Sequence, residues 1–189
     1  MISYFETHFP VSDELGRDLH RLSQPCAFPK QGSVFEAGQR IDRMWLVTQG
    51  LVRVYELRDG SDQTYYFGAE WSWLTDFSSY LTGEPTAFSC DCLEPTQAVL
   101  FPKKAIEWLA ERYPEIRLFY QRMAEQAYLQ LDERMKRFQF DDLESRYRTF
   151  SSRYPNLLQR IPQHLVATYL GVTPESLSRV RQQLRRKGL

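Results

Sequence analysis

The sequence predicts an α+β fold with a β-rich first half and an all-α second half. Glycine turns divide the first hundred residues into short apolar segments typical of strands. After Pro102 the apolar residues recur every three or four positions, as they do in helices. Charge divides in the same way: the first 100 residues hold 7 basic and 14 acidic side chains and the rest hold 17 and 10, which sum to 24 and 24. A basic second half indicates a polyanionic partner.

The composition, 42% hydrophobic and 25% charged, is typical of an ordered protein. No apolar run exceeds four residues and no basic stretch precedes an apolar one at the start, so we expect a cytoplasmic protein without membrane contact. Cys26, Cys90 and Cys92 fit neither a disulfide framework nor a zinc site. We therefore expect reduced, packed cysteines, with redox sensing as the alternative.

Nothing in the sequence predicts an enzyme. His8, His20 and His164 are scattered, and none lies near a motif for a nucleophile. The chain contains no Walker loop, no G-x-G-x-x-G and no H-E-x-x-H. We expect no catalytic residues and no metal site.

Strands are expected between residues 30 and 101, with turns at Gly38, Gly50 and Gly60. Residues 44–47 form an apolar strand. The Asp59-Gly60 pair lies between residues 52–55 and 64–67, and it predicts a hairpin because both residue types tolerate the positive φ of tight turns.

Two helices are expected next, over residues 103–113 and from residue 115 to about 138, separated by Pro114. The second is about 24 residues, or roughly 36 Å, long. Its apolar stripe comprises Tyr120, Ala124, Ala127 or Tyr128, Leu131, Met135 and Phe138. The stripe either packs on the β unit alone or also forms a parallel seam with a second copy. We favour the seam, and hence a homodimer.

A further helix is expected over residues 143–154, capped by Asp141-Asp142 and ended by Pro155. The domain boundary is placed near Phe140. The predicted division is a β domain over residues 1–114, a dimerisation helix over 115–140 and a helical domain over 141–189.

The helical domain ends in a predicted helix-turn-helix. The first helix has Pro162 in its first turn and is closed by Gly171. Thr173 then provides an N-cap, and Pro174 occupies the first position of the second helix. The inward stripe of that helix comprises Leu177, Val180 and Leu184.

The second helix is basic on its outer face. From Ser176 onward there is no acidic residue, and the basic residues are Arg179, Arg181, Arg185, Arg186 and Lys187. Hydroxyl groups at a helix N-terminus followed by arginines suit phosphates and guanine edges in a major groove. The alternative is a solvated basic tail after a structural helical hairpin.

Residues 161–181 resemble the DNA-binding helices of Crp/Fnr-type regulators, especially the short versions of Bacteroidetes-type bacteria. The family's recognition-helix pattern is matched by Glu175, Ser176, Leu177, Ser178 and Arg179. The resemblance implies that Glu175 and Arg179 read bases, each contributing about 1–3 kcal/mol of discrimination, and that Ser176 contacts phosphate. One departure is that many members have a β wing after this helix, whereas this sequence ends at Leu189.

The predicted contacts with double-stranded DNA follow from this pattern and from the basic face. They are Gln163, Thr173, Glu175, Ser176, Ser178, Arg179, Arg181, Gln182, Arg185 and Arg186.

The resemblance extends to the β half, whose turn glycines fall where the family's cyclic-nucleotide-binding β-roll has them. It implies a double-stranded β-helix, a jelly roll like that of cyclic-nucleotide-binding domains. The family binds the cyclic phosphate through Phe-x-Gly-Glu and a later Arg-Ser or Arg-Thr. Those positions fall here on Trp73, Thr75, Asp76, Thr86 and Ala87, so the arginine is missing.

No arginine occurs between Glu70 and Phe101, where an anion would meet repulsion from acidic residues. These are Glu70, Asp76, Glu84, Asp91 and Glu94. We therefore predict that cyclic AMP does not bind strongly, and we expect no cofactor. A candidate pocket for another effector, neutral or cationic, comprises Tyr65, Trp71, Trp73, Asp76, Thr86 and Ala87. Alternatively, the aromatic residues among these belong to the core.

The sequence thus predicts a sequence-specific transcription regulator of the Crp/Fnr type that binds double-stranded DNA as a homodimer and is not controlled by cyclic AMP. RNA polymerase is a further candidate partner. The alternative is a ligand-binding sensor module whose C-terminal helices bind a protein instead of DNA.

Overall fold

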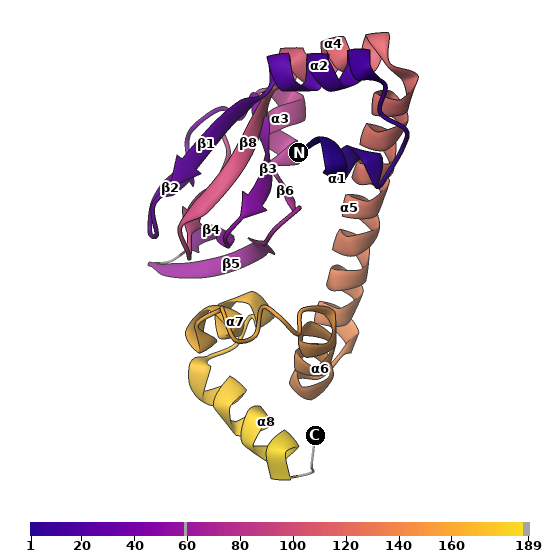
Figure 1. Ribbon diagram of the computed structural model, residues 1–189. Helices are drawn as coiled ribbons and strands as arrows, with labels where there is room; N and C mark the ends of the chain where they lie inside the picture. The colour runs from indigo at the N-terminus through magenta and orange to yellow at the C-terminus, as the bar shows by residue number, and fades with distance from the viewer. Residues whose placement is uncertain (59, 187–189) are drawn as a thin grey trace.

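The computed structural model describes residues 1–58 and 60–186 (Figure 1). The predictions for Asp59 of the hairpin pair and for Lys187 of the basic run, like the end of the chain at Leu189, lie outside these residues. The strands are β1 Gln24–Phe28, β2 Ser33–Phe35, β3 Arg43–Gln49, β4 Val52–Arg58, β5 Ser61–Gly68, β6 Trp73–Leu74, β7 Ser89–Cys92 and β8 Thr96–Pro102. The helices are α1 Ile2–Glu6, α2 Asp13–Leu22, α3 Phe77–Thr82, α4 Lys103–Arg112, α5 Pro114–Phe140, α6 Leu143–Arg153, α7 Gln163–Leu170 and α8 Pro174–Arg186.

The strands form two four-stranded antiparallel sheets, in the orders β1-β8-β3-β6 and β2-β7-β4-β5. Sheet side chains alternate between two faces, and the inner faces of the two sheets bury a common core. That core includes Trp45, Val47, Val54, Cys90 and Cys92. The predicted β half is therefore confirmed as an antiparallel sheet core, although it begins at Gln24 and not near Lys30.

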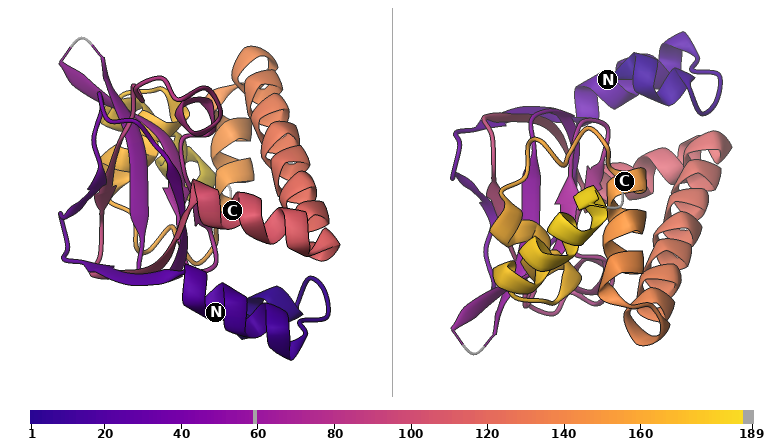
Figure 2. Two further views of the ribbon diagram at one scale, coloured as in Figure 1. Left: turned by 90° about the horizontal axis from the view of Figure 1, so that it is seen from above. Right: turned by 90° about the horizontal axis from the view of Figure 1, so that it is seen from below.

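Helices cover the outer face of the β1-β8-β3-β6 sheet. Met44 of β3 and Phe101 of β8 point to this side, and they pack with residues of α1, α2, α4 and α5. Neither α1 nor α2 was predicted from the sequence, although α2 has a clear local signal: Ser12 caps it by accepting a hydrogen bond from the Leu15 amide. Figure 2 shows these N-terminal helices beside the sheets.

The long helix α5 runs along one side of the molecule, from α4 to α6 (Figure 1). Its 27 residues span about 40 Å. The N-terminal part packs through Ile116 and Phe119 into the helical cluster. Farther along, the predicted apolar stripe is largely exposed, with Tyr128 at 69% and Met135 at 64% of their surface. The β unit alone therefore does not cover the stripe.

The C-terminal helices share an apolar cluster with the β sheets. Leu51 and Phe67 of the β unit are buried together with Phe150, Val166 and Leu177 of α6, α7 and α8. Thr64 of β5 also forms a 2.6 Å hydrogen bond with Thr168 of α7. The cluster crosses the predicted domain boundary near Phe140, and α7 lies against β5 with α8 beyond it (Figure 1). We call this contact between the C-terminal helices and the β unit the joint.

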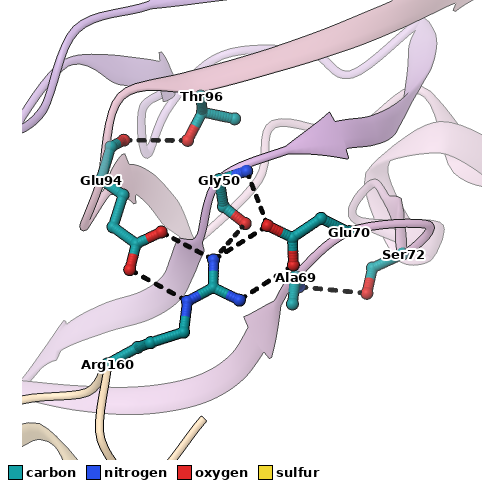
Figure 3. A network of polar contacts seen from close by, with 7 residues as sticks. All are labelled: Gly50, Ala69, Glu70, Ser72, Glu94, Thr96 and Arg160. Atoms are coloured by element: carbon teal, nitrogen blue, oxygen red, sulfur yellow. Dashed lines mark hydrogen bonds and ion pairs between the residues drawn. The ribbon is translucent and has the colours of Figure 1, made fainter. Parts of the chain in front are cut away.

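Arg160, in the segment between α6 and α7, provides the polar part of the joint (Figure 3). Its guanidinium makes a bidentate contact with Glu94, at 3.0 and 2.6 Å, and a second with Glu70, at 2.9 Å to each oxygen. It also donates to the Gly50 carbonyl at 3.1 Å, and the Gly50 amide donates to Glu70 at 3.0 Å. Both carboxylates and a backbone loop of the β unit are thus held by one side chain.

Arg134 of α5 forms a second polar contact at the joint. It donates hydrogen bonds to the carbonyls of Thr64 and Tyr65 in β5 and to that of Tyr169 in α7. Its guanidinium lies 4.4 Å from the ring centroid of Tyr169 and 5.3 Å from that of Tyr65. One arginine therefore connects α5, β5 and α7.

A paired substitution tests the packing at the end of α7. Gly171 and Gly83 both end a helix with positive φ, at +69° and +76°. An alanine Cβ meets the Phe138 ring at Gly171 but open space at Gly83. We expect Gly83→Ala to lower the free energy of unfolding by about 1–2 kcal/mol from backbone strain. Gly171→Ala should cost more, because the Phe138 ring must also leave its place beneath Arg146. Equal losses in urea denaturation would contradict this packing.

The Arg160 contacts also predict a pH dependence. The hydrogen bond from Arg160 is the main cause that lowers the pKa of Glu70 from 4.5 to about 2. A carboxylate with a depressed folded pKa stabilises the fold fully above its unfolded pKa, and this contribution is lost as the pH falls toward the folded value. Glu70→Gln should therefore lower the urea midpoint at pH 6, and its difference from wild type should shrink between pH 4.5 and 2.5.

Arg160→Gln is the matched variant, since it removes the guanidinium that pairs with the Glu70 carboxylate. Its urea midpoint should fall below that of Glu70→Gln, because Glu94 and the Gly50 carbonyl also lose their partner. The double variant should be less destabilised than the sum of the two. A difference between wild type and Glu70→Gln that stays constant from pH 6 to 2.5 would contradict the assignment.

Candidate nucleic-acid interface

Helices α7 and α8 meet at a tight corner that is specified by residues at the corner itself. Gly171 ends α7 in the left-handed conformation, and Val172 donates its amide to the Ala167 carbonyl at 3.0 Å. The Thr173 hydroxyl accepts from the Ser176 amide at 3.3 Å, so it caps α8, and Pro174 is the first residue of that helix. The boundaries follow the sequence prediction closely; α7 begins at Gln163, with Pro162 as its N-cap.

One face of α8 packs against the other C-terminal helices. Leu177 and Leu184 are buried and Val180 is half-buried, in agreement with the predicted inward stripe. The opposite line of the helix follows the spacing i, i+4, i+7, i+11. It carries Glu175, Arg179, Gln182 and Arg186, all exposed. We call these four residues the α8 ridge.

The α8 ridge belongs to a helix that lies apart from the sheets. Figure 1 shows α7 between β5 and α8, with α8 as the element farthest from the β unit. Of the other predicted DNA contacts, Thr173, Ser178 and Arg185 are exposed, while Gln163, Ser176 and Arg181 are half-buried. The structure therefore places most of the predicted contacts on one accessible surface, and the DNA-binding role of each stays a prediction.

The α8 ridge carries both a carboxylate and arginines. The arginines suit an anionic partner, and the carboxylate suits one that also donates hydrogen bonds. Glu175 is the only acidic residue of α8, in its first turn. Its pKa is lowered, chiefly by a hydrogen bond from its own backbone amide and also by the Thr173 hydroxyl, so it is an ionised acceptor at neutral pH. Arg179 lies one turn on, with its guanidinium 3.4 Å from the Ser176 hydroxyl. Carboxylate and guanidinium are thus adjacent on the ridge.

The six residues of the predicted effector pocket are not brought together. Tyr65 and Trp73 line one cavity, between the sheets, α5 and the C-terminal helices. Trp71 stacks on Tyr4, with ring centroids 5.6 Å apart, and Asp76 caps α3 at the Ser78 amide. The remaining two lie outside this cavity, Thr86 buried and Ala87 exposed.

Three arginines of functional interest were missed by the sequence analysis. Arg134 and Arg160 form the joint, and Arg153 lies with Arg134 on the cavity wall. Their partners lie far away in the chain; Glu70, for example, is 90 residues from Arg160. The only signal was the excess of basic residues in the second half, which was assigned to an external polyanion alone.

The described part of the chain shows neither a metal-ligand cluster nor a membrane-spanning helix. Residues 1–58 and 60–186 hold no cluster of histidine, cysteine and acidic side chains suited to a metal ion. None of the helices in these ranges has the length and apolar character to cross a membrane. Cys90 and Cys92 are buried between the sheets, and burial raises the pKa of the Cys90 thiol. This burial favours the packing interpretation of these two cysteines.

Residues 25–113 match the family model of the cyclic nucleotide-binding domain. No curated protein matches the chain in sequence. Among solved structures, FixK2 from Bradyrhizobium japonicum has a TM-score of 0.76 at 18% identity, covering 88% of this chain and 86% of that one. A variant of CooA from Carboxydothermus hydrogenoformans has a TM-score of 0.75 at 16% identity, covering 94% and 82%.

The c-di-GMP-responsive global regulator CLP of Xanthomonas campestris has a TM-score of 0.72 at 14% identity and covers 94% of each chain. Similarity at these identities shows the fold, and it includes α5 and the C-terminal helices because the coverage extends well beyond residues 25–113. The chain therefore shares the fold of these solved structures, and its residues 25–113 are similar to the cyclic nucleotide-binding domain.

Proposed function

We propose that this protein is a sequence-specific, DNA-binding transcription regulator that acts as a homodimer and is not controlled by cyclic AMP. The observation that carries the proposal is the α8 ridge, an exposed carboxylate-and-arginine surface opposite the buried stripe of the last described helix. A helix-turn-helix presents such a surface to the major groove. The fold of the chain, shared with transcription regulators, supports the same function.

On this proposal the ridge residues have different tasks. Arg179 would donate to O6 and N7 of guanine, and Glu175 would accept from a cytosine amino group. The hydroxyls of Thr173, Ser176 and Ser178 and the later arginines would contact phosphates. RNA polymerase stays a candidate partner, on the family resemblance alone.

Independence from cyclic AMP rests on the position where the family has its phosphate-binding arginine. Thr86 occupies that position, and its backbone is engaged with Gly38 and Gln39 at 2.8 Å each. The next residue, Ala87, has no polar side chain to offer. The cyclic phosphate thus lacks its guanidinium partner there.

The homodimer is proposed to form along α5. The exposed residues Ala124, Tyr128, Leu131, Met135 and Phe138 recur at steps of three and four, which is the spacing of a helix–helix seam. A parallel pair of α5 helices would bury this stripe and carry two copies of the α8 ridge at the same end. Two half-sites about one helical turn of DNA apart would match that symmetry.

Arg179→Ala tests the role in base recognition. We expect the variant to lose about 1–3 kcal/mol of affinity for a selected palindromic site and much less for random DNA, because a bidentate guanine contact specifies sequence. Mobility shifts over a salt series provide the measurement, and cyclic AMP should leave the wild-type affinity unchanged.

Arg17→Ala, an exposed arginine of α2 far from the α8 ridge, is the control and should behave as wild type. Equal losses by Arg179→Ala on both DNAs would reject a base-reading role. A wild-type protein with no salt-dependent DNA complex would instead favour the alternative, a sensor module that binds a protein.

Charged substitutions on α5 test the dimer. We expect Tyr128→Glu combined with Met135→Glu to weaken self-association about tenfold or more, because unpaired carboxylates would be buried in the seam. Sedimentation equilibrium measures the change. Leu129→Glu is the matched control, since Leu129 is 55% exposed but lies on another side of the same helix. A wild-type monomer at all concentrations, or equal effects of both changes, would overturn the proposed seam.

A further inference from the structure

A cavity of about 390 Å³ lies between the sheets, α5 and the C-terminal helices. Its walls include Tyr65 and Trp73 from the β unit, Leu131 and Arg134 from α5, and Arg153 and Tyr169 from the C-terminal helices. Cavities that hold small organic molecules begin at about 300 Å³, and they combine aromatic walls with a few polar groups. This one has the size and the lining for such a molecule.

The charge of the cavity wall is positive. Arg134 and Arg153 line it, and none of its described lining residues is acidic. None of the acids that suggested anion repulsion in the sequence lines this cavity. Glu70 and Glu94 bind Arg160, and Asp91 binds Arg53 of β4 at 3.0 and 2.8 Å.

The two arginines differ in what they can offer a ligand. Arg134 already donates to three backbone carbonyls. Arg153 pairs with Glu133 at 3.6 Å, but Glu133 is held more closely by Arg137, at 2.6 Å. At 3.6 Å the Arg153 pair lies beyond ordinary hydrogen-bond distance, so its guanidinium keeps donors for an anion.

We propose that this cavity binds a small organic anion with an aromatic ring, the anionic group on Arg153 and the ring against Trp73 and the neighbouring tyrosines. Planar guanidinium groups bind carboxylates through two parallel hydrogen bonds, and aromatic faces stabilise rings by offset or edge contacts. The site differs from the family's phosphate position, because Thr86 and Ala87 do not line this cavity.

The cavity also couples a ligand to the joint. Its walls come from the β unit, from α5 and from the C-terminal helices, so a ligand gains all its contacts only while the joint is closed. A ligand that prefers one arrangement shifts the population toward it. The coupling rests on the proposed function, because it links the ligand to DNA binding. Binding of the anion itself does not depend on that function.

Two probes of equal shape test the site: 2-naphthoate, which is anionic, and 2-naphthamide, which is neutral. We expect 2-naphthoate to bind below about 1 mM in calorimetric titration and to change the tryptophan fluorescence, a change that Trp73→Phe reduces. The amide should bind about tenfold more weakly or worse, since it lacks the charge-assisted contact. No saturable 2-naphthoate binding below this concentration, or equal affinities of the two probes, would overturn the proposal.

Two variants locate the binding. Arg153→Gln should lower 2-naphthoate affinity about tenfold and leave 2-naphthamide affinity unchanged. Arg148→Gln, on the same helix but paired with Glu144 outside the cavity, is the control and should bind as wild type. Ala127→Phe should block both probes by filling the cavity without removing charge. Equal behaviour of Arg153→Gln and Arg148→Gln would place the probe elsewhere.

The affinity for 2-naphthoate and the affinity for DNA are measured separately. If 2-naphthoate binds at Arg153 and also changes the affinity for the selected DNA site, the coupling holds. Binding at Arg153 in a protein that forms no DNA complex would reject the proposed function but retain the ligand site. Binding at Arg153 with unchanged affinity for DNA would reject the coupling alone.

Discussion

The contact of one guanidinium with two carboxylates determines where the C-terminal helices lie. Glu70 and Glu94 both reach the same terminal nitrogen of Arg160, at 2.9 and 2.6 Å. Without that cation, two like charges would face each other across a few ångströms, at a cost that partial burial increases. The apolar cluster around Phe67 and Val166 adds area to the joint, but the ion pairs fix its position, because apolar contact has no preferred direction.

The joint changes the meaning of the charge asymmetry in the sequence. An acidic first half and a basic second half suggested an external polyanion, and the exposed arginines of the α8 ridge still fit one. Arg160 and Arg134, however, bind within the chain, Arg160 to carboxylates of the β unit and Arg134 to backbone carbonyls. Part of the complementarity is therefore intramolecular, and the exposed arginines of the α8 ridge remain available to an external partner.

The elements predicted from sequence are those whose signals are local. Residues within a few positions of each feature predict the corner at Gly171 and Pro174, the start of α5 at Pro114 and the β4–β5 hairpin. By contrast, α1 and α2 were not predicted, although the Ser12 cap of α2 is itself a local signal. The joint and the cavity depend on residues up to 110 positions apart, and periodicity carries no information on such pairs. The predicted pocket residues are not grouped for this reason: Trp71 stacks on Tyr4, 67 positions earlier in the chain, and Asp76 caps α3.

The joint has a further effect on β5, which is the edge strand of its sheet. Unpaired backbone groups along an edge strand invite pairing with another chain, which leads to aggregation. Here α7 lies against β5, Thr168 bonds Thr64, and Arg134 occupies the carbonyls of Thr64 and Tyr65. Any movement that frees the C-terminal helices therefore also uncovers a strand edge beside an apolar surface. A protein built this way has to limit how long its joint stays open, because the open arrangement is also the one most prone to self-association through β5.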